Sequence, residues 1–184
     1  MLLLSSGFLQ SQQFTKTVVP VLNAFSEEIG APIYLATRDE FEVLYLAHAA
    51  LDNKAISLGF GVGSRVPLLS TGIGRALLVS ASQEDRTTAI AHAPLEKHTS
   101  KTIINRSDIA RKLNEASDAG VVFTDGEFEL GVAALAMPFL SEEPFPLALG
   151  MSAEQDAFSS KYKMNVTSAL RACRNHLADT IHML

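Results

Sequence analysis

The sequence predicts an α+β domain built on a mostly antiparallel sheet. Three patterns lead to this prediction. Helical periodicity comes first, strand patterns follow, and the order then runs through helices, further strands and a closing helix. Two early strand patterns are separated by only three polar residues, as in a hairpin. The later strand patterns contain few charges, which is typical of central strands covered by helices.

The chain opens with an apolar segment and an amphipathic helix. Residues 2–13 have the pattern of a short helix or arm with its own apolar stripe. Apolar residues then recur at helical spacing from Phe14 to Ile29, and Gly30 is placed to end that helix. Pro20 interrupts the pattern. We expect it to begin or kink the helix, because proline has no N–H to continue the hydrogen-bond ladder.

The first strands form the predicted hairpin. Strands over residues 32–37 and 41–48 flank the polar loop 38–40. Alternation in the second strand puts Phe41, Val43 and Tyr45 on one face and Glu42, Leu44 and Leu46 on the other. A third strand is expected over residues 55–60.

The most informative stretch is residues 61–80, where a strand-like run passes through a glycine-containing turn into a helix. Thr71 is placed as the N-cap of that helix. The backbone amides of Gly72, Ile73 and Gly74 then lack intrahelical partners, and a carboxylate is the ligand that such a helix start favours. The alternative is a tight strand-to-helix turn that binds nothing.

The rest of the chain is expected to form two helices, three strands and a final helix. A helix is expected from its N-cap Ser82, and another over residues 106–119 with Gly120 as its stop. The remaining expected elements are strands over residues 121–124, 131–140 and 145–152, a turn over 141–144, and a final helix with an apolar stripe at Val166, Leu170, Cys173, Leu177, Ile181 and Leu184.

Composition limits the classes of function. The chain has 184 residues, the length of one domain or of a domain with an arm, and is 47% hydrophobic. A net charge of −5 argues against binding of nucleic acid by this chain alone. The single cysteine excludes an internal disulfide framework and suits a reducing cytoplasm. No apolar run is long enough to span a membrane, and the first residues lack the basic region of a signal peptide.

Searches for catalytic and cofactor motifs find no support. The chain has neither a GxSxG elbow nor a Walker A sequence, and Gly59, Gly61 and Gly63 lack the last spacing of a dinucleotide-binding motif. We therefore expect no enzyme activity and no cofactor.

Metal sites are also weakly supported. Cys173 and His176 lie one helical turn apart, a spacing that a metal ion could use. Cys173 continues an apolar stripe, however, so we interpret it as a buried structural thiol. His92 and His98 flank a proline without matching ligands and are expected to be solvated loop residues.

Acidic residues alternate at Asp125, Glu127 and Glu129 in a strand-like segment. Such a segment could hold a cation. The more common interpretation is an exposed, hydrated connection, so we predict no metal ligand here.

Two longer segments, residues 64–80 and 101–140, resemble the effector-binding domain of IclR-type bacterial transcription regulators. The most specific parts are the Thr-Gly-x-Gly-Arg-Ala helix start at Thr71, the Glu-Leu-Gly motif at Glu129, and Pro138 downstream of it. The resemblance runs over nearly the whole chain and keeps the order of these parts. It implies a GAF-like fold, with about six strands and helices on both faces of the sheet.

The resemblance also implies a domain organisation. Residues 14–184 would be the effector-binding domain, and residues 1–13 the end of an interdomain linker helix or an oligomerisation arm. Family members carry a winged helix-turn-helix domain ahead of this one and bind operator DNA as dimers or tetramers. That DNA-binding domain is absent from this chain, so we expect the chain to be part of a longer regulator. A stand-alone sensor is the alternative.

In the family, a small carboxylic acid lies in a cleft of the sheet, with its carboxylate at the amides of the Thr-Gly-x-Gly turn. The matching positions are Gly72 and Ile73. The resemblance and the physics of a helix N-terminus therefore indicate the same place.

Four other pocket positions follow from the resemblance. Thr124 stands where an acidic residue is frequent, Ala134 where a cysteine is frequent, and Gly150 where a serine is common, while Ser152 is kept. We expect these departures to make the pocket roomier and less polar. They favour an apolar or aromatic acid over a two- or three-carbon keto acid.

These inferences lead to a ligand-sensing regulatory domain that acts in the cytoplasm without catalysis. The alternative from another class is an enzyme acting on a small aromatic acid in the same cleft. We expect a homodimer or homotetramer, because the first residues would otherwise expose apolar side chains, namely Leu2, Leu3, Leu4, Phe8 and Leu9. Operator DNA would be bound only through the missing N-terminal domain, and no membrane partner is expected.

Overall fold

A single six-stranded sheet forms the centre of the fold. The computed structural model describes residues 12–49, 60–139 and 145–181. The strand order is β3-β2-β1-β6-β5-β4, and every neighbouring pair is antiparallel. The strands are β1 (Ile33–Asp39), β2 (Glu42–Ala49), β3 (Arg65–Pro67), β4 (Val122–Asp125), β5 (Val132–Pro138) and β6 (Leu147–Glu154). The predicted α+β class and antiparallel sheet are confirmed.

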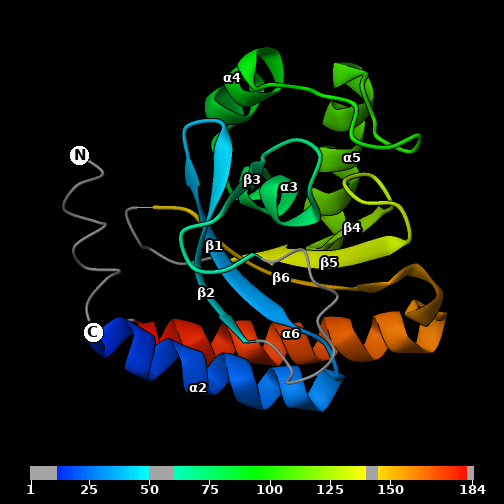
Figure 1. Cartoon of the computed structure of the whole chain (residues 1–184). Coiled ribbons are helices and arrows are strands. Elements are labelled where there is room, and N and C mark those ends of the chain that lie inside the picture. The colour runs from blue at the N-terminus through cyan, green and yellow to red at the C-terminus, as the bar shows by residue number, and fades with distance from the viewer. Residues whose placement is uncertain (1–11, 50–59, 140–144, 182–184) are drawn as a thin grey trace.

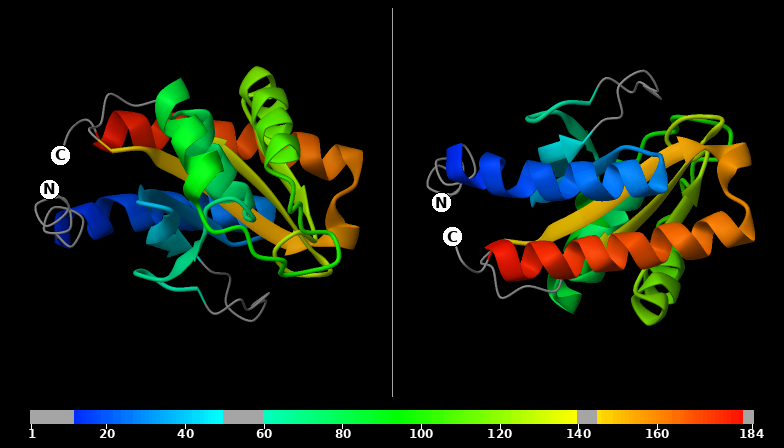
Figure 2. Two further views of the ribbon diagram at one scale, coloured as in Figure 1. Left: turned by 90° about the horizontal axis from the view of Figure 1, so that it is seen from above. Right: turned by 90° about the horizontal axis from the view of Figure 1, so that it is seen from below.

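Helices cover both faces of this sheet, as the resemblance implied (Figure 1). The helices are α2 (Gln12–Ile29), α3 (Gly72–Val79), α4 (Gln83–His92), α5 (Arg106–Ala119) and α6 (Ser160–Ile181), with a short 3₁₀ turn, η1 (Gln155–Ala157), before α6. Helices α2 and α6 lie side by side on one face, and α3, α4 and α5 lie on the other (Figure 2).

Each face has its own apolar core. The stripe of α2 (Phe14, Val18 and Leu22) and that of α6 pack against one side of the sheet. On the other side, α3, α4 and α5 pack over Val43, Tyr45 and neighbouring residues. This division follows from strand periodicity, because successive side chains of a strand point to opposite faces. The predicted alternation along the second strand is confirmed.

The helix starts and stops predicted from the sequence are also confirmed. Ser82 Oγ accepts a hydrogen bond from the Asp85 amide at 3.1 Å, which caps α4. Gly30 and Gly120 end α2 and α5 with φ angles of 67° and 68°. Glycine adopts this left-handed conformation without steric cost, which explains its place at the helix stops.

The hairpin loop is shorter than predicted. Arg38 and Asp39 belong to β1, Asp39 pairs with Glu42, and only Glu40 and Phe41 form the loop. Arg65 on β3 forms ion pairs with both Asp39 and Glu42. These charges therefore extend the strands instead of forming a polar loop.

A register shift at the middle of the hairpin alters the strand pattern locally. Leu35 pairs with Ala47 and Ala36 with Tyr45, so Leu46 is the extra residue of a β-bulge. Leu46 and Ala47 consequently both join the core on the α2 side.

Pro20 does not begin a helix, which corrects that part of the prediction, whereas the predicted kink stays a prediction. It lies inside the continuous helix α2. Its side chain and that of Lys16 are both exposed. The Lys16 carbonyl, which proline deprives of its partner, can therefore be hydrated, and the helix continues past the missing hydrogen bond.

Strand β4 lies at an edge of the sheet, whereas β5 and β6 are internal. The prediction of a central position was therefore wrong for β4, which is only four residues long and leaves Phe123 37% exposed. Helices α3 and α5 cover only its other face.

Several expectations lie outside the described residues. These are the arm up to residue 11, the third strand over residues 55–59, the turn over residues 141–144, and Leu184. Phe60, the last residue of the expected third strand, is not in a strand. The strand next to β2 is instead β3, within the strand-like run predicted before the glycine turn. In the described part, no helix is long and apolar enough to cross a membrane.

Replacing Pro20 by alanine is expected to stabilise the protein. Alanine restores an N–H to bond the Lys16 carbonyl, and its helix propensity is higher by about 3 kcal/mol. Part of this gain is offset because the unfolded chain becomes more flexible, by up to about 1 kcal/mol. Urea unfolding should show a net gain of about 1–2 kcal/mol. The exposed Lys16→Ala variant is the control, and a loss of stability in Pro20→Ala would contradict this account.

Candidate functional site

The N-terminus of α3 forms one wall of the candidate site. Thr71 caps the helix, because its Oγ1 accepts from the Gly74 amide at 3.2 Å and donates to the Pro67 carbonyl at 2.7 Å. The cap confirms the predicted N-cap but takes up one of the three amides expected to be available. The first-turn amides without an intrahelical partner are therefore those of Gly72 and Ile73.

The two glycines of this turn have different roles. A Cβ added to Gly74 would lie 2.8 Å from the carbonyl carbon of Leu68, so the helix start can pack on that backbone only with glycine. A Cβ added to Gly72 would lie 3.1 Å from Thr124 Oγ1 and 3.5 Å from Ala134 Cβ. Gly74 is required by packing, whereas Gly72 brings the helix start close to the sheet.

The sheet beneath α3 brings distant parts of the sequence into one row. Thr124 on β4 pairs with Ala134 on β5, and Ala134 pairs with Ser152 on β6. Gly150 lies in the next row, between Ala136 and Tyr34. Most residues in these rows are small, so α3 can approach the sheet closely.

The small residue at Gly150 does not enlarge the pocket in the way the sequence suggested. A Cβ added there would lie 3.2–3.4 Å from atoms of the Ile73 side chain. The space above Gly150 is therefore filled by Ile73. The expectation of extra room at this position is wrong, because the helix start supplies its own apolar side chain.

All six predicted site residues line one cavity between α3 and the sheet. Its lining residues are Tyr34, Tyr45, Phe60, Val66, Thr71, Gly72, Ile73, Thr124, Glu127, Phe128, Glu129, Val132, Ala134, Leu135, Ala136, Gly150, Met151 and Ser152. The cavity volume is about 60 Å³. By the space that a buried water needs, this is room for about four to six water molecules.

Aromatic rings form a continuous arc along this cavity. The ring centroids of Tyr34 and Tyr45 are 5.1 Å apart, those of Tyr45 and Phe60 5.6 Å, and those of Phe60 and Phe128 6.2 Å. These distances lie in the range of favourable aromatic pairs. The arc offers a flat, apolar ligand both buried area and ring contacts.

The two tyrosines of the arc stay protonated near neutral pH. Burial raises the pKa of Tyr34, and a hydrogen bond with Ser152 offsets part of that rise. Burial also raises the pKa of Tyr45, to which the neighbouring Tyr34 adds. Both phenols therefore remain neutral groups that can donate a hydrogen bond.

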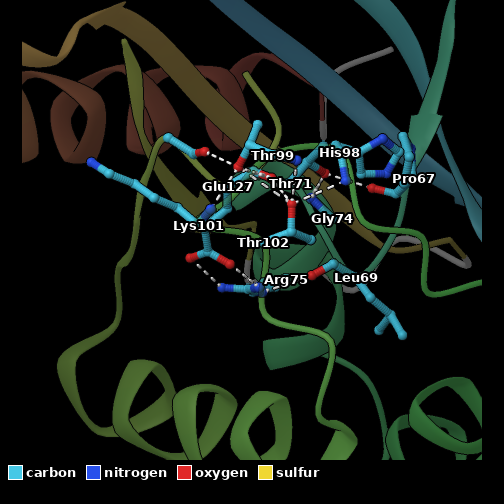
Figure 3. Close-up of polar contacts among 11 residues, drawn as sticks. Pro67, Leu69, Thr71, Gly74, Arg75, His98, Thr99, Lys101, Thr102 and Glu127 are labelled. Carbon is cyan, nitrogen blue, oxygen red and sulfur yellow. Dashed lines mark hydrogen bonds and ion pairs between the residues drawn. The ribbon is translucent and has the colours of Figure 1, made fainter. Parts of the chain in front are cut away.

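A buried ion pair joins the helix start to the turn between β4 and β5. Arg75 is only 2% exposed, and its Nε donates to the Leu69 carbonyl at 2.8 Å. Its Nη1 and Nη2 donate to the two carboxylate oxygens of Glu127 at 2.9 and 2.5 Å (Figure 3). Such bidentate geometry is the strongest form of this pair. It fixes the two walls of the cavity relative to each other.

Two threonines hold the same turn from the other side (Figure 3). Thr102 Oγ1 donates to the Glu127 carbonyl at 2.6 Å and accepts from the amides of His98 and Thr99 at 3.1 and 2.8 Å. Thr99 Oγ1 donates to the Gly126 carbonyl at 2.6 Å. The loop before α5 therefore anchors the backbone that carries Glu127.

The acidic segment is not the exposed, hydrated connection that we expected. Glu127 is 9% exposed and bound to Arg75. Glu129 is half-buried and lines the cavity, and only the outer residue, Asp125, forms a surface ion pair with Lys101. The alternation was correctly recognised, but the arginine that draws Glu127 inwards was not.

The remaining metal candidates behave as ordinary residues. Cys173 is buried and burial raises its pKa to about 12, whereas His176 is exposed, so the two do not form a site. His98 is an exposed loop residue, as expected, and its ring centroid lies 5.0 Å from that of Phe128. His92 is also exposed, but it is the last residue of α4 and not a loop residue. Among the described residues, no group of three or more His, Cys, Asp or Glu could hold a metal ion.

Comparison with known proteins identifies the family. The model of the bacterial transcriptional regulator IclR C-terminal domain matches residues 6–179 of this chain. The chain belongs to this family. The resemblance noted from the sequence is thereby confirmed.

Curated IclR relatives are similar at modest identity. The Pca operon regulatory protein of Acinetobacter baylyi is 27% identical over 142 residues, which cover 76% of this chain and 51% of that protein. The p-hydroxybenzoate hydroxylase transcriptional activator of the same organism is 26% identical over 183 residues, 96% of this chain and 68% of that protein. The chain thus spans about half the length of the Pca regulator. Both relatives are named as regulators, in agreement with the prediction that the chain is not an enzyme.

Solved IclR structures share the fold. The IclR protein of Thermotoga maritima has a TM-score of 0.85 at 19% identity, covering 95% of this chain and 70% of that chain. The inducer-binding domain of an Acinetobacter PobR double mutant, in complex with 3-hydroxybenzoic acid, has a TM-score of 0.80 at 25% identity, covering 89% of this chain and 97% of that chain. The six-stranded sheet with helices on both faces is therefore the fold of this family.

Sequence reasoning missed the aromatic arc and the partner of Arg75. The arc combines residues from β1, β2 and two loops, and no short motif joins them. Arg75 did carry a signal, because it is the single charged residue in the apolar helix GIGRALLV. A charge in such a helix needs a buried counter-ion, and the alternating acids downstream were the candidates.

Breaking the buried ion pair is expected to destabilise the protein strongly. Arg75→Met leaves the Glu127 carboxylate buried without its charged partner, which costs about 3–5 kcal/mol. The double variant Arg75→Met/Glu127→Met should recover most of this loss, because no uncompensated charge remains. Urea unfolding measures both effects.

The exposed i,i+4 pair of Arg111 and Glu115 provides the control. Arg111→Met should have a much smaller effect than Arg75→Met, because solvent screens a surface pair. Equal losses in the two single variants would contradict a special role for the buried pair.

Proposed function

We propose that this chain is the effector-sensing domain of an IclR-type transcription regulator, and that it binds a small aromatic or apolar carboxylic acid. The carboxylate would lie at the amides of Gly72 and Ile73, and the ring along the aromatic arc. The observation that carries this proposal is that one cavity combines a helix N-terminus with the arc. Binding would modulate the affinity of a DNA-binding domain for its operator.

The helix start supports a negatively charged group. Two first-turn amides have no partner within α3, and the helix dipole favours an anion at this end. Each charge-assisted hydrogen bond to a carboxylate would contribute about 1.5–3 kcal/mol. Because these donors are backbone groups, they need no charged side chain in the cavity.

The cavity also supports a choice among acids. A two- or three-carbon keto acid is too short to make apolar contacts along the arc. An aromatic ring could contact several rings of the arc at once. Similar proteins agree with this choice, since one is named for p-hydroxybenzoate hydroxylase and another was solved with 3-hydroxybenzoic acid. Thr124, Ala134 and Ser152 would form the floor beneath the ligand, and Gly150 would line its edge, where the Ile73 side chain covers it.

The regulatory context rests on the family. The Pca regulator is about twice as long as the segment matched here, so an additional domain in the complete regulator is consistent with the family. We propose that residues 14–184 form the sensing domain, that residues 1–13 belong to a linker helix or an arm, and that the regulator acts in the cytoplasm. Operator DNA would be bound only through the N-terminal domain.

Gly72→Ala is expected to weaken ligand binding while the fold is retained. The added Cβ would lie 3.1 Å from Thr124 Oγ1 and would crowd the amide that meets the carboxylate. Calorimetry with 4-hydroxybenzoate should show an affinity at least about tenfold lower than that of wild type, which corresponds to the loss of one charge-assisted hydrogen bond. Pyruvate should bind wild type more weakly than 4-hydroxybenzoate does.

Gly61→Ala is the matched control, because a Cβ there meets nothing within 4 Å. It should bind 4-hydroxybenzoate like wild type. Equal affinity of Gly72→Ala and wild type, or no binding of any aromatic acid, would refute the proposed position of the carboxylate.

The second prediction from this proposal concerns assembly. We expect a homodimer or homotetramer, since the apolar side chains that the sequence places in residues 2–9 would be covered in an oligomer. Light scattering at tens of micromolar protein should give at least twice the mass of one 19.8 kDa chain. A clean monomer at that concentration would disprove this expectation.

The third prediction concerns DNA. This chain carries a net charge of −5, so it should not bind duplex DNA tightly on its own. A mobility-shift titration at low salt, with DNA of mixed sequence, should show no complex at micromolar protein. Tight binding that weakens as salt is raised would contradict the assignment of DNA recognition to another domain.

A further inference from the structure

One carboxylate oxygen beside the cavity has no hydrogen-bond partner among the residues that the structure describes. Oε2 of Glu129 is buried, and no described residue donates a hydrogen bond to it. Glu129 lines the cavity together with Gly72 and Ile73. A buried polar atom without a hydrogen bond costs free energy, so native proteins rarely leave one unsatisfied without a functional reason.

The other acidic residue of the cavity provides the contrast. Both carboxylate oxygens of Glu127 are bound by Arg75. Among the described residues that line the cavity, none is lysine, arginine or histidine. The protein thus compensates the charge of Glu127 but offers no charged donor to Glu129.

The backbone around Glu129 is held in place by hydrogen bonds. Its carbonyl accepts from the Val132 amide at 3.3 Å, and the Gly126 amide donates to the Val132 carbonyl at 2.9 Å. The Gly131 carbonyl accepts from the Gln155 amide at 2.7 Å. These bonds tie both sides of the turn that carries Glu129 to the sheet.

Glu129 and the helix start belong to different parts of the cavity. Gly72 lies over the ladder pair of Thr124 and Ala134. The ladder ends one pair later, at Asp125 and Ala133, and Glu129 lies in the turn beyond that end. A ligand whose carboxylate meets Gly72 can therefore present another group to Glu129.

We propose that Glu129 selects the effector, by accepting a hydrogen bond from a hydroxyl or amino group on the ring of the aromatic acid. This proposal rests on the proposed function, because it assumes that the carboxylate lies at Gly72 and Ile73. The ligand class is then an aromatic acid with a hydrogen-bond donor away from its carboxylate. Acids without that donor leave the Glu129 oxygen without a hydrogen bond.

A site built to bond a polar group rejects an analogue that lacks the group, because its own partner is left unpaired. The matched pair of probes is 4-hydroxybenzoate and 4-methylbenzoate, which are similar in shape and differ in the donor. Calorimetry on wild type should show a preference of at least tenfold for the hydroxyl compound. 3-Hydroxybenzoate and 4-aminobenzoate distinguish the position and the kind of donor.

Two variants test the role of Glu129 itself. Glu129→Met removes the acceptor and should reduce the preference to about one, chiefly by weakening 4-hydroxybenzoate and strengthening 4-methylbenzoate. Glu129→Gln keeps an acceptor oxygen and should retain part of the preference. Glu154→Gln is the control, because Glu154 is exposed and does not line the cavity, and its preference should equal that of wild type.

The outcomes separate this inference from the proposed function. A wild-type preference near one for all the donor-bearing acids overturns the inference, even if Glu129→Met fails to fold. An equal preference in wild type and both Glu129 variants also overturns it, while the aromatic-acid site would stand. Failure of every aromatic acid to bind wild type overturns both proposals.

Discussion

The buried pair of Arg75 and Glu127 connects two walls of the cavity. Arg75 extends from the first turns of α3, and Glu127 lies in the turn between β4 and β5, so the pair closes one wall onto the other. Neither residue could be buried alone, because an isolated charge in this interior would be expensive. Thr99 and Thr102 reinforce the pair by holding the backbone of the same turn. These contacts tie the two walls to each other.

Small side chains set the second constraint, which is the closeness of α3 to the sheet. Alanine and glycine occupy the rows beneath the helix start, so Gly72 comes near Thr124, and Ile73 fills the space over Gly150. The cavity is what remains between this contact and the aromatic arc. Under our proposal, backbone amides of the protein bind the carboxylate of the ligand, and the aromatic arc contacts its ring. Glu129 then accepts a hydrogen bond from the polar group on that ring.

The elements and the helix start were predictable because their signals are local. Thr71, the glycines after it and the apolar stripes of the helices specify caps and faces through neighbours in the chain. The pairing of Arg75 with Glu127 was not predictable, since it joins residues that only the sheet topology brings together. Gly150 shows the same limit, because a small residue in the sequence reveals that space exists but not which side chain fills it.

The measurement that tests this account most directly is the response of individual amides in ¹⁵N-labelled protein to 4-hydroxybenzoate. The account predicts the largest changes in chemical shift at the Gly72 and Ile73 amides, because these would bond the carboxylate. The Gly74 amide, already bonded to Thr71, should change less. Saturable binding that shifts other residues but leaves Gly72 and Ile73 unchanged would contradict the central claim.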